Sequence, residues 1–381
     1  MLYTVPPSRS LIWVICVFFL IAAVETMLIL AINQLCPTLV EKIERNLGMS
    51  EINRQTELDI LRLLATLAVI AIHAVKITAP FGIAPLVWCV PVFFLISGRF
   101  FLDPERKVTT ERLFQKNVVH IVTTLFFWSA IFTIYYLLSG SYNGLNFFGV
   151  LVEFIHGPYH LWFLYALIGL YLLTPIFRRI AADDKTLIYT LLLFAIVNVT
   201  TEYLIYLPGL GNIIDDFASK LGLRMVTGYM GYYLLGYYIW KKKDTIGKRQ
   251  ESAIYILGVV MFVATIVAEC KISNDLRDAD FVKQYLKPNV IMFSAALYMF
   301  FIKRVSQWSF LEKTRCGFMK LAEYGLGVYC VHALLSELIP ALWLCKLQVF
   351  SSLLQVLILY LLSLICTWLI RKIPYIGKMI T

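Results

Sequence analysis

The chain has 381 residues, of which 60% are hydrophobic, and its mean hydropathy is +0.76. A soluble protein of this length cannot bury so much apolar surface, so the composition excludes a soluble globular domain. A net charge of +10 would suggest nucleic-acid binding in a soluble chain, but here the basic residues fall between apolar segments. We therefore expect a polytopic membrane protein that binds membrane lipids and no nucleic acid.

Apolar segments near the length that a helix needs to cross a bilayer recur along the whole chain. They predict an all-α, polytopic transmembrane helix bundle. We expect residues 49–381 to form a domain of ten core spans, and residues 1–48 to form an appended N-terminal helix with its cytoplasmic connection. The expected spans cover roughly residues 11–33, 57–75, 84–102, 118–138, 159–177, 186–206, 225–240, 252–270, 289–303, 321–341 and 347–370.

The connections between these spans differ in charge. If the connection before Leu58 is cytoplasmic and the sides alternate, the cytoplasmic connections hold 23 Lys and Arg residues and the opposite ones hold 8. Lys and Arg favour the cytoplasmic side of membrane proteins. The asymmetry therefore predicts a multi-pass protein of the cell membrane, with a cytoplasmic C-terminus.

The span at 57–75 carries ionisable side chains inside an apolar helix. Spacings of three and four residues place one stripe of side chains on a single helix face, namely Asp59, Arg62, Thr66, Val69 and His73. Asp59 and Arg62 can pair, and His73 lies about 16 Å further along the helix, half a bilayer. Because ionisable residues are costly in a membrane and histidine exchanges protons near neutral pH, the stripe indicates chemistry within the membrane.

The expected span at 84–102 has two small residues and an arginine near its end. Ser97 and Gly98 would allow a neighbouring helix to approach closely, and Arg99 is expected to extend its side chain to the cytoplasmic edge.

The eight cysteines lack CxxC spacing, and the five histidines do not cluster with them in the sequence. The sequence therefore predicts no metal site and no bound cofactor.

Five stretches, in order along the predicted spans, resemble a known family. They are Leu58-Asp59-x-Leu61-Arg62 with His73, Phe93-Phe94-Leu95-x-Ser97-Gly98, Arg112-Leu113-Phe114-Gln115-Lys116 leading to Trp128, His160-Leu161-Trp162 through Thr174-Pro175, and Gly325-x-Gly327-x-Tyr329-x-x-His332. Together they resemble the acyltransferase-3 family of integral-membrane O-acyltransferases over about residues 54–371. The last two are similar to the branch that contains the enterobacterial common antigen O-acetyltransferase. The chain departs from the family pattern at Lys116, where a second Arg is common, and at Arg99, where an aromatic or apolar residue is usual.

The resemblance implies transfer of a short acyl group, usually acetyl, from acyl-CoA to a sugar hydroxyl. The acceptor would be a cell-surface glycan or its lipid-linked precursor, in a bacterial inner or plasma membrane. His73 would deprotonate the hydroxyl or become transiently acylated, and the residues leave both routes open. Arg62, beside Asp59, would hold CoA phosphates together with Arg112 and Lys116, and Ser97 would belong to the same donor site.

Four residues are candidates for acceptor binding, namely His160, Trp162, Tyr165 and His332. Trp162 and Tyr165 could instead belong to an aromatic belt at the interface. His332 could be a structural histidine that bonds to Ser336 or to a carbonyl group. Two other functions stay open, a transporter or flippase of lipid-linked sugars and a membrane sensing module. No oligomeric state is predicted.

Overall fold

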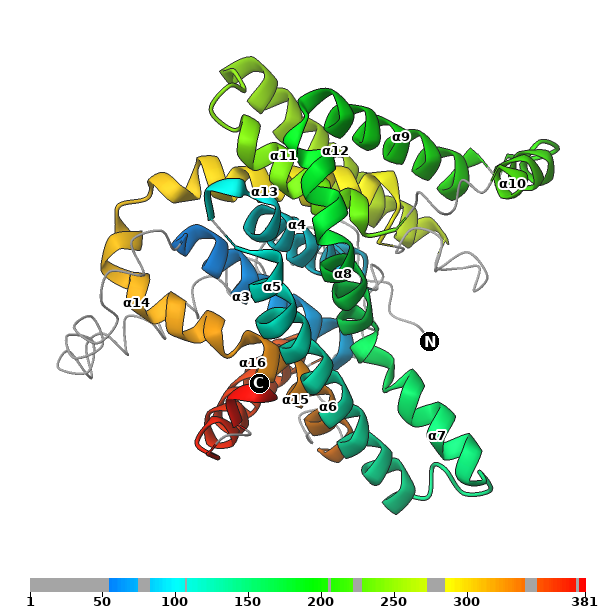
Figure 1. Ribbon diagram of the computed structural model, residues 1–381, viewed down its shortest axis with the longest axis vertical. Coiled ribbons are helices and arrows are strands. Elements are labelled where there is room, and N and C mark those ends of the chain that lie inside the picture. The colour runs from blue at the N-terminus through cyan, green and yellow to red at the C-terminus, as the bar shows by residue number, and fades with distance from the viewer. Residues whose placement is uncertain are drawn as a thin grey trace.

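The computed structural model of the chain describes residues 55–74, 83–106, 108–204, 207–221, 228–272, 285–339, 348–374 and 377–381. Within these ranges the chain folds into helices and contains no β-strand, as the composition predicts (Figure 1). The appended helix expected in residues 1–48 lies outside the described residues. The boundary proposed between residues 48 and 49 lies outside them as well.

The described helices cover the expected core spans and also parts of the expected connections, at residues 110–112, 147–156, 211–220 and 310–323. They are α3 (Thr56–Ala74), α4 (Cys89–Leu102), α5 (Thr110–Arg112), α6 (Val119–Leu138), α7 (Phe147–His156), α8 (Trp162–Ala182), α9 (Asp184–Glu202), α10 (Gly211–Lys220), α11 (Met230–Lys242), α12 (Lys248–Ile272), α13 (Pro288–Lys303), α14 (Phe310–Glu323), α15 (Gly325–Leu338) and α16 (Gln348–Arg371). A π-helical turn, Leu113–Val118, joins α5 to α6, and a 3-10 turn, Tyr159–Leu161, precedes α8.

Helix α3 lies at the centre of the bundle, in contact with α4, α13, α14, α15 and α16 (Figure 1). Its sequence is rich in Leu and Ala and has no Gly or Pro, which favours a helix, and Glu57 and Asp59 stabilise its positive N-terminal end. From Leu58 to Ala71 every side chain except that of Arg62 is buried. Other helices therefore surround most of α3, and Asp59 is buried while Glu57, Arg62 and His73 keep partial exposure.

Helices α4 and α11 make the closest helix contact around this centre. A Cβ atom on Gly98 would lie 1.7 Å from the carbonyl oxygen of Tyr233, and one on Gly236 would lie 2.0 Å from that of Leu95. Only glycine permits backbones to approach so closely, and here each helix supplies one. The expectation that Gly98 admits a neighbouring helix is confirmed, and α4 is thereby held beside α3.

Seven helical segments in the described part of the chain are long and apolar enough to cross a membrane. They match seven of the ten predicted core spans, and the count of ten is not confirmed. The other three expected spans correspond to α3, to α11 with 13 residues, and to the region of α14 and α15, where α15 has 14 residues. Helix α3 carries three charged residues, and α11 and α15 are shorter than a bilayer requires.

Arg99 does not extend to the membrane edge, so that prediction was wrong. Its side chain is buried, forms an ion pair with Asp103, and its guanidinium carbon lies 3.8 Å from the centre of the Trp240 ring. A local carboxylate and an aromatic face from α11 stabilise this charge inside the protein, although Nε of Arg99 has no hydrogen-bond partner among the described residues. The sequence alone favoured snorkelling because the contact with Trp240 joins distant parts of the chain.

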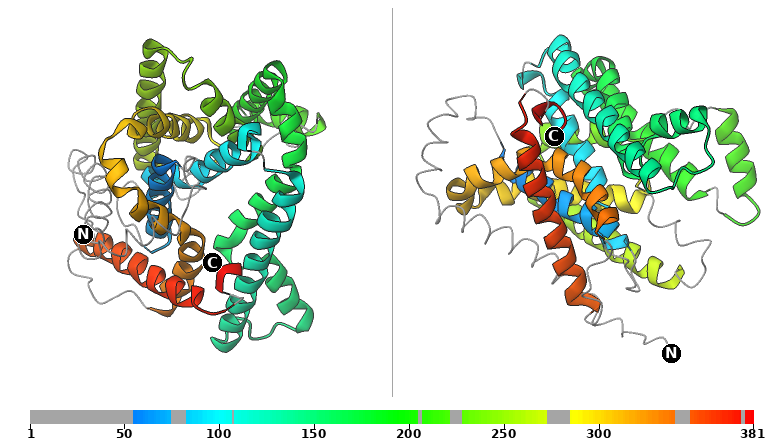
Figure 2. Two further views of the ribbon diagram at one scale, coloured as in Figure 1. Left: turned by 60° about the vertical axis from the view of Figure 1, so that its left-hand side comes forward. Right: turned by 90° about the horizontal axis from the view of Figure 1, so that it is seen from below.

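The C-terminal residues lie against α6 (Figure 2). The indole nitrogen of Trp128 donates a hydrogen bond of 2.9 Å to the carbonyl oxygen of Ile380, and the Thr124 hydroxyl donates one of 3.2 Å to that of Met379. The guanidinium of Arg371, at the end of α16, bonds to Thr381. These bonds join α6 to α16 and close one side of the bundle.

Candidate active site

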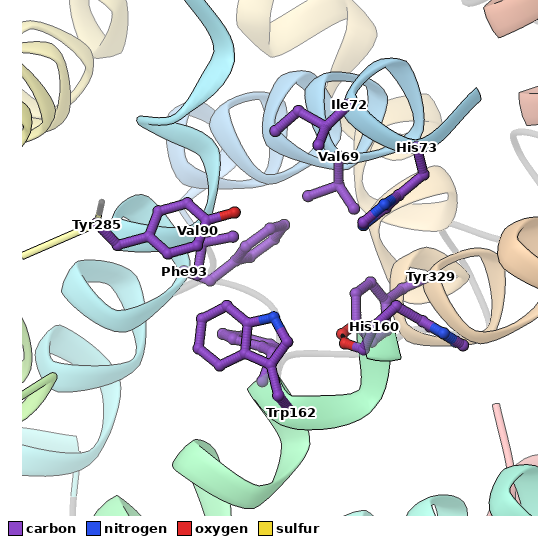
Figure 3. Close-up of a pocket in the computed structure, with 10 residues that line it drawn as sticks. Val69, Ile72, His73, Val90, Phe93, His160, Trp162, Tyr285 and Tyr329 are labelled. Atoms are coloured by element: carbon purple, nitrogen blue, oxygen red, sulfur yellow. Dashed lines mark hydrogen bonds between the residues drawn. The ribbon is translucent and has the colours of Figure 1, made fainter. Parts of the chain in front are cut away.

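A small cavity lies between the centre of the bundle and the start of α8 (Figure 3). Its free volume is about 20 Å³, on the order of one water molecule, so it is too small to enclose a glycan. Figure 3 shows the imidazole of His73 and the indole of Trp162 on opposite sides of it. Its lining residues are Val69, Ile72, His73, Val90, Phe93, His160, Trp162, Phe163, Tyr285 and Tyr329.

His73 is placed at the cavity by the last turn of α3. The helical period puts it on the stripe of Val69, which also lines the cavity. Its ring centre lies 5.3 Å from that of Tyr159 and 5.5 Å from that of His332. His73 lies in an apolar helix, and the rings nearest to it come from the turn before α8 and from α15.

His332 is fully buried in α15, and one hydrogen bond defines the state of its ring. Nδ1 lies 2.5 Å from the carbonyl oxygen of Tyr329, which can only accept, so Nδ1 carries the proton. Nε2 of the neutral ring then carries a lone pair, and it has no hydrogen-bond partner among the described residues. Ser336 bonds instead to the carbonyl oxygen of Ala333. Of the two structural partners considered for His332, the carbonyl group is therefore the one present.

His160 completes a group of three histidine rings from three separate elements. Its ring centre is 5.9 Å from that of His332, and its backbone carbonyl accepts a hydrogen bond from the Tyr329 hydroxyl. The side chain is buried, and neither ring nitrogen has a hydrogen-bond partner within the described ranges. In that same part of the chain no group of His, Cys, Asp or Glu side chains could hold a metal ion. Imidazole rings can accept and donate protons near neutral pH, so this arrangement suits proton transfer.

An aromatic wall faces the histidines across the cavity. The ring of Trp162 stacks on Tyr285 with centres 5.5 Å apart and packs on Tyr229 at 5.3 Å, and Tyr229 stacks on Phe94 at 4.5 Å. The motif around Trp162 located one member of this wall. Tyr285 and Tyr229 were missed, because neither stands in a periodic or motif-like context in the sequence.

Tyr165, the fourth candidate for acceptor binding, does not line the cavity. Its ring is partly exposed, and its hydroxyl donates a hydrogen bond to the carbonyl oxygen of Ile155 at the end of α7. Helices α6 and α7 lie side by side, and this bond fixes the end of α7 to α8 (Figures 1 and 2). The position fits the aromatic-belt interpretation that the sequence left open.

Arg62 and Asp59 form the predicted ion pair near the start of α3. Nη1 of Arg62 lies 3.1 Å from Oδ1 of Asp59, and its guanidinium carbon lies 4.7 Å from the centre of the Phe100 ring. The Arg62 side chain keeps 30% of its surface exposed, whereas that of Asp59 is buried. Part of the Arg62 side chain is therefore accessible from outside the bundle.

The other candidate donor-binding residues occupy different surroundings. Arg112 ends α5 and Lys116 lies in the π-helical turn, and both side chains are exposed. That turn packs against α6 and α8. Ser97 is half-buried on α4, one residue before the close contact of Gly98 with α11. Arg112 and Lys116 offer a basic surface at the predicted cytoplasmic ends of these helices.

A family model described as an acyltransferase domain, of the acyltransferase-3 type, matches residues 55–372. The chain belongs to the acyltransferase-3 family. It is a membrane protein with the general activity of that family, acyl transfer. No curated protein and no solved structure matches this acyltransferase.

Proposed function

We propose that this acyltransferase moves an acetyl or other short acyl group from acyl-CoA to a hydroxyl of a cell-surface glycan or of its lipid-linked precursor. The observation that carries the proposal is the position of His73, which faces a small cavity opposite Trp162 on the helix that also holds Arg62. A proton acceptor and an aromatic platform on either side of one cavity suit transfer to a sugar. The resemblance to the common-antigen branch supports a bacterial cell membrane as the location.

The chemical step needs a base, because a sugar hydroxyl is a poor nucleophile at neutral pH. An imidazole nitrogen of His73 takes the hydroxyl proton while the oxygen attacks the thioester carbonyl carbon. The C–S bond then breaks, and the CoA thiolate leaves with the proton that His73 held. Direct transfer needs one base and no covalent intermediate, and His73 supplies the cavity with an imidazole that can take and return a single proton.

The donor would enter from the cytoplasmic end of α3. The phosphates of CoA would contact the guanidinium of Arg62, which Asp59 orients, and the exposed side chains of Arg112 and Lys116 would extend this basic surface. From Arg62 to His73 the helix rises about 16 Å, comparable to an extended pantetheine arm. Ser97, on the neighbouring helix, would line the path of that arm.

The acceptor would contact the opposite side of the cavity. Trp162 offers an indole face at the start of α8. The ring nitrogens of His160 and Nε2 of His332 are buried and unbonded among the described residues, and they would bond sugar hydroxyls once a bound acceptor widens the cavity. Tyr165 contributes indirectly, since its hydroxyl holds the end of α7. In this proposal the CoA donor binds near the start of α3 and the acceptor binds near its end.

The decisive experiment is reconstitution of the purified protein in lipid vesicles with labelled acetyl-CoA and a set of lipid-linked glycans. Wild type is expected to transfer label to a glycan, and His73→Ala in correctly inserted protein is expected to transfer none. A wild-type protein that moves glycan across the vesicle membrane without any acyl transfer would reject the proposal and favour the flippase.

A further inference from the structure

A group of tyrosines around one carboxylate lies at the end of the bundle where α6 and α15 finish. The Tyr136 hydroxyl donates a hydrogen bond of 2.8 Å to Oε1 of Glu337, which joins the last turns of the two helices. The ring of Tyr142 lies 5.3 Å from that of Tyr136. We call Tyr136, Tyr142, Tyr159 and Glu337 the tyrosine–carboxylate cluster.

Tyr159 brings this cluster next to the candidate base. Its ring meets that of His73 edge-on with centres 5.3 Å apart, and the centre of the His160 ring is 5.4 Å away. Tyr159 is 53% exposed, so a ligand at the surface can reach it directly. Glu337 is near enough to act electrostatically on both Tyr159 and Tyr142. The cluster therefore has one member, Tyr159, that is both exposed at the surface and in contact with His73.

The charges identify which end of the bundle this is. The connection at 139–158, which contains Tyr142 and precedes Tyr159, has no Lys or Arg. By the distribution of basic residues it lies on the non-cytoplasmic side, opposite the end where Arg62 would hold CoA. A molecule at the cluster would therefore approach His73 from the side away from the donor.

The groups present are those that recognise carbohydrates. Aromatic faces pack against the C–H face of a sugar ring, and a carboxylate accepts hydrogen bonds from adjacent hydroxyls. Only Oε1 of Glu337 accepts a bond from a described residue, which leaves Oε2 for a ligand. Burial, and after it the carboxylates of Glu153 and Glu337, raises the pKa of Tyr142, so its phenol remains a donor. Negative charge here would disfavour an anionic sugar.

We propose that Glu337, Tyr136 and Tyr159 bind the acceptor sugar, and that this sugar is uncharged or cationic rather than a uronic acid. The inference rests on the proposed function and adds the acceptor class and the side of approach. Glu337 accepts hydrogen bonds from sugar hydroxyls that do not react, and Tyr159 packs against the sugar ring. These contacts direct the reacting hydroxyl to His73. Glu337 and Tyr136 are positioning residues, because they contact the acceptor away from the reacting atoms.

The test uses the full chain in lipid nanodiscs with methyl glucoside, methyl N-acetylglucosaminide and methyl glucuronide as probes. Glu337→Gln and Tyr136→Phe are expected to raise the KM for a neutral glycoside about tenfold, while the KM for acetyl-CoA stays within about twofold. Saturation-transfer NMR is expected to show the neutral glycosides bound to wild type, and the glucuronide bound more weakly. The matched control is Asp216→Asn, whose exposed carboxylate pairs with Lys220 on α10, away from α6 and α15 (Figure 1).

Two results would overturn the inference. One is an unchanged KM for the glycosides in Glu337→Gln, and the other is the absence of a saturation-transfer signal for every glycoside with wild type. The binding measurement needs no turnover, so it separates this inference from the proposed function. Glycoside binding that depends on Glu337, in a protein that transfers no acyl group, would support the sugar site and reject acyl transfer.

Discussion

The imidazole rings of His73 and His332 lie 5.5 Å apart, although 259 positions separate the two residues in the chain. One ring comes from the last turn of α3 and the other from the middle of α15, and both helices belong to the centre of the bundle. The bond from Nδ1 of His332 to a backbone carbonyl group keeps the lone pair on Nε2. His73 therefore lies beside a ring whose tautomer is set by the backbone.

His73→Ala is expected to reduce acyl transfer at least about 100-fold, because the variant has no base for the sugar hydroxyl. The rate of label transfer from acetyl-CoA to glycan measures it. The control is His156→Ala, which removes an exposed histidine at the end of α7, and it is expected to transfer at the wild-type rate. Transfer by correctly inserted His73→Ala at a tenth of the wild-type rate or more would contradict the assignment.

A pair of substitutions at His332 tests the roles of its two ring nitrogens separately. The amide of His332→Asn can still donate to the Tyr329 carbonyl group but has nothing in place of Nε2, whereas that of His332→Gln offers an oxygen near the Nε2 position. If Nε2 assists the reaction, Gln is expected to retain several times more activity than Asn, with kcat changing more than KM. Equal activity in the two variants, at equal amounts of folded protein, would show a purely structural histidine.

Arg62→Ala is expected to raise the KM for acetyl-CoA about tenfold and to slow the bound-state reaction less, since a charge-assisted bond to phosphate is lost. Arg62→Lys keeps the charge but loses the planar fork, so an intermediate value is expected. Initial rates at varied acetyl-CoA provide the measurement. A KM that stays constant while folded protein is lost would leave Arg62 as the structural partner of Asp59.

Gly98→Ala is expected to destabilise the bundle by about 1–3 kcal/mol, because the new Cβ would collide with the carbonyl oxygen of Tyr233 and push α4 away from α11. Thermal unfolding in detergent, followed by size-exclusion chromatography, measures the loss. The matched control is Gly169→Ala on α8, where a Cβ would meet nothing within 4 Å. Equal melting temperatures for the two variants would contradict the close backbone contact.

Much of this protein follows from local sequence. Composition and segment length require apolar helices in a membrane, and the helical period alone puts Arg62 and His73 on one stripe and Asp59 within reach of Arg62. The small residue Gly98 indicates a close helix contact because only a missing side chain allows one. These features depend on residues within a few turns of one another, so one sequence is enough to predict them.

The tertiary structure decided what surrounds them. His332 and Tyr159 meet His73, Tyr285 joins Trp162, and Trp240 covers Arg99, all through contacts between distant segments. It also gave α11 a length of 13 residues and α15 a length of 14, which leaves the predicted count of ten spans unconfirmed. Hydropathy shows which segments are apolar, and the helical period shows which side chains share a helix face. Which helix becomes the neighbour of that face depends on packing along the whole chain, and that packing brings three histidines into one group.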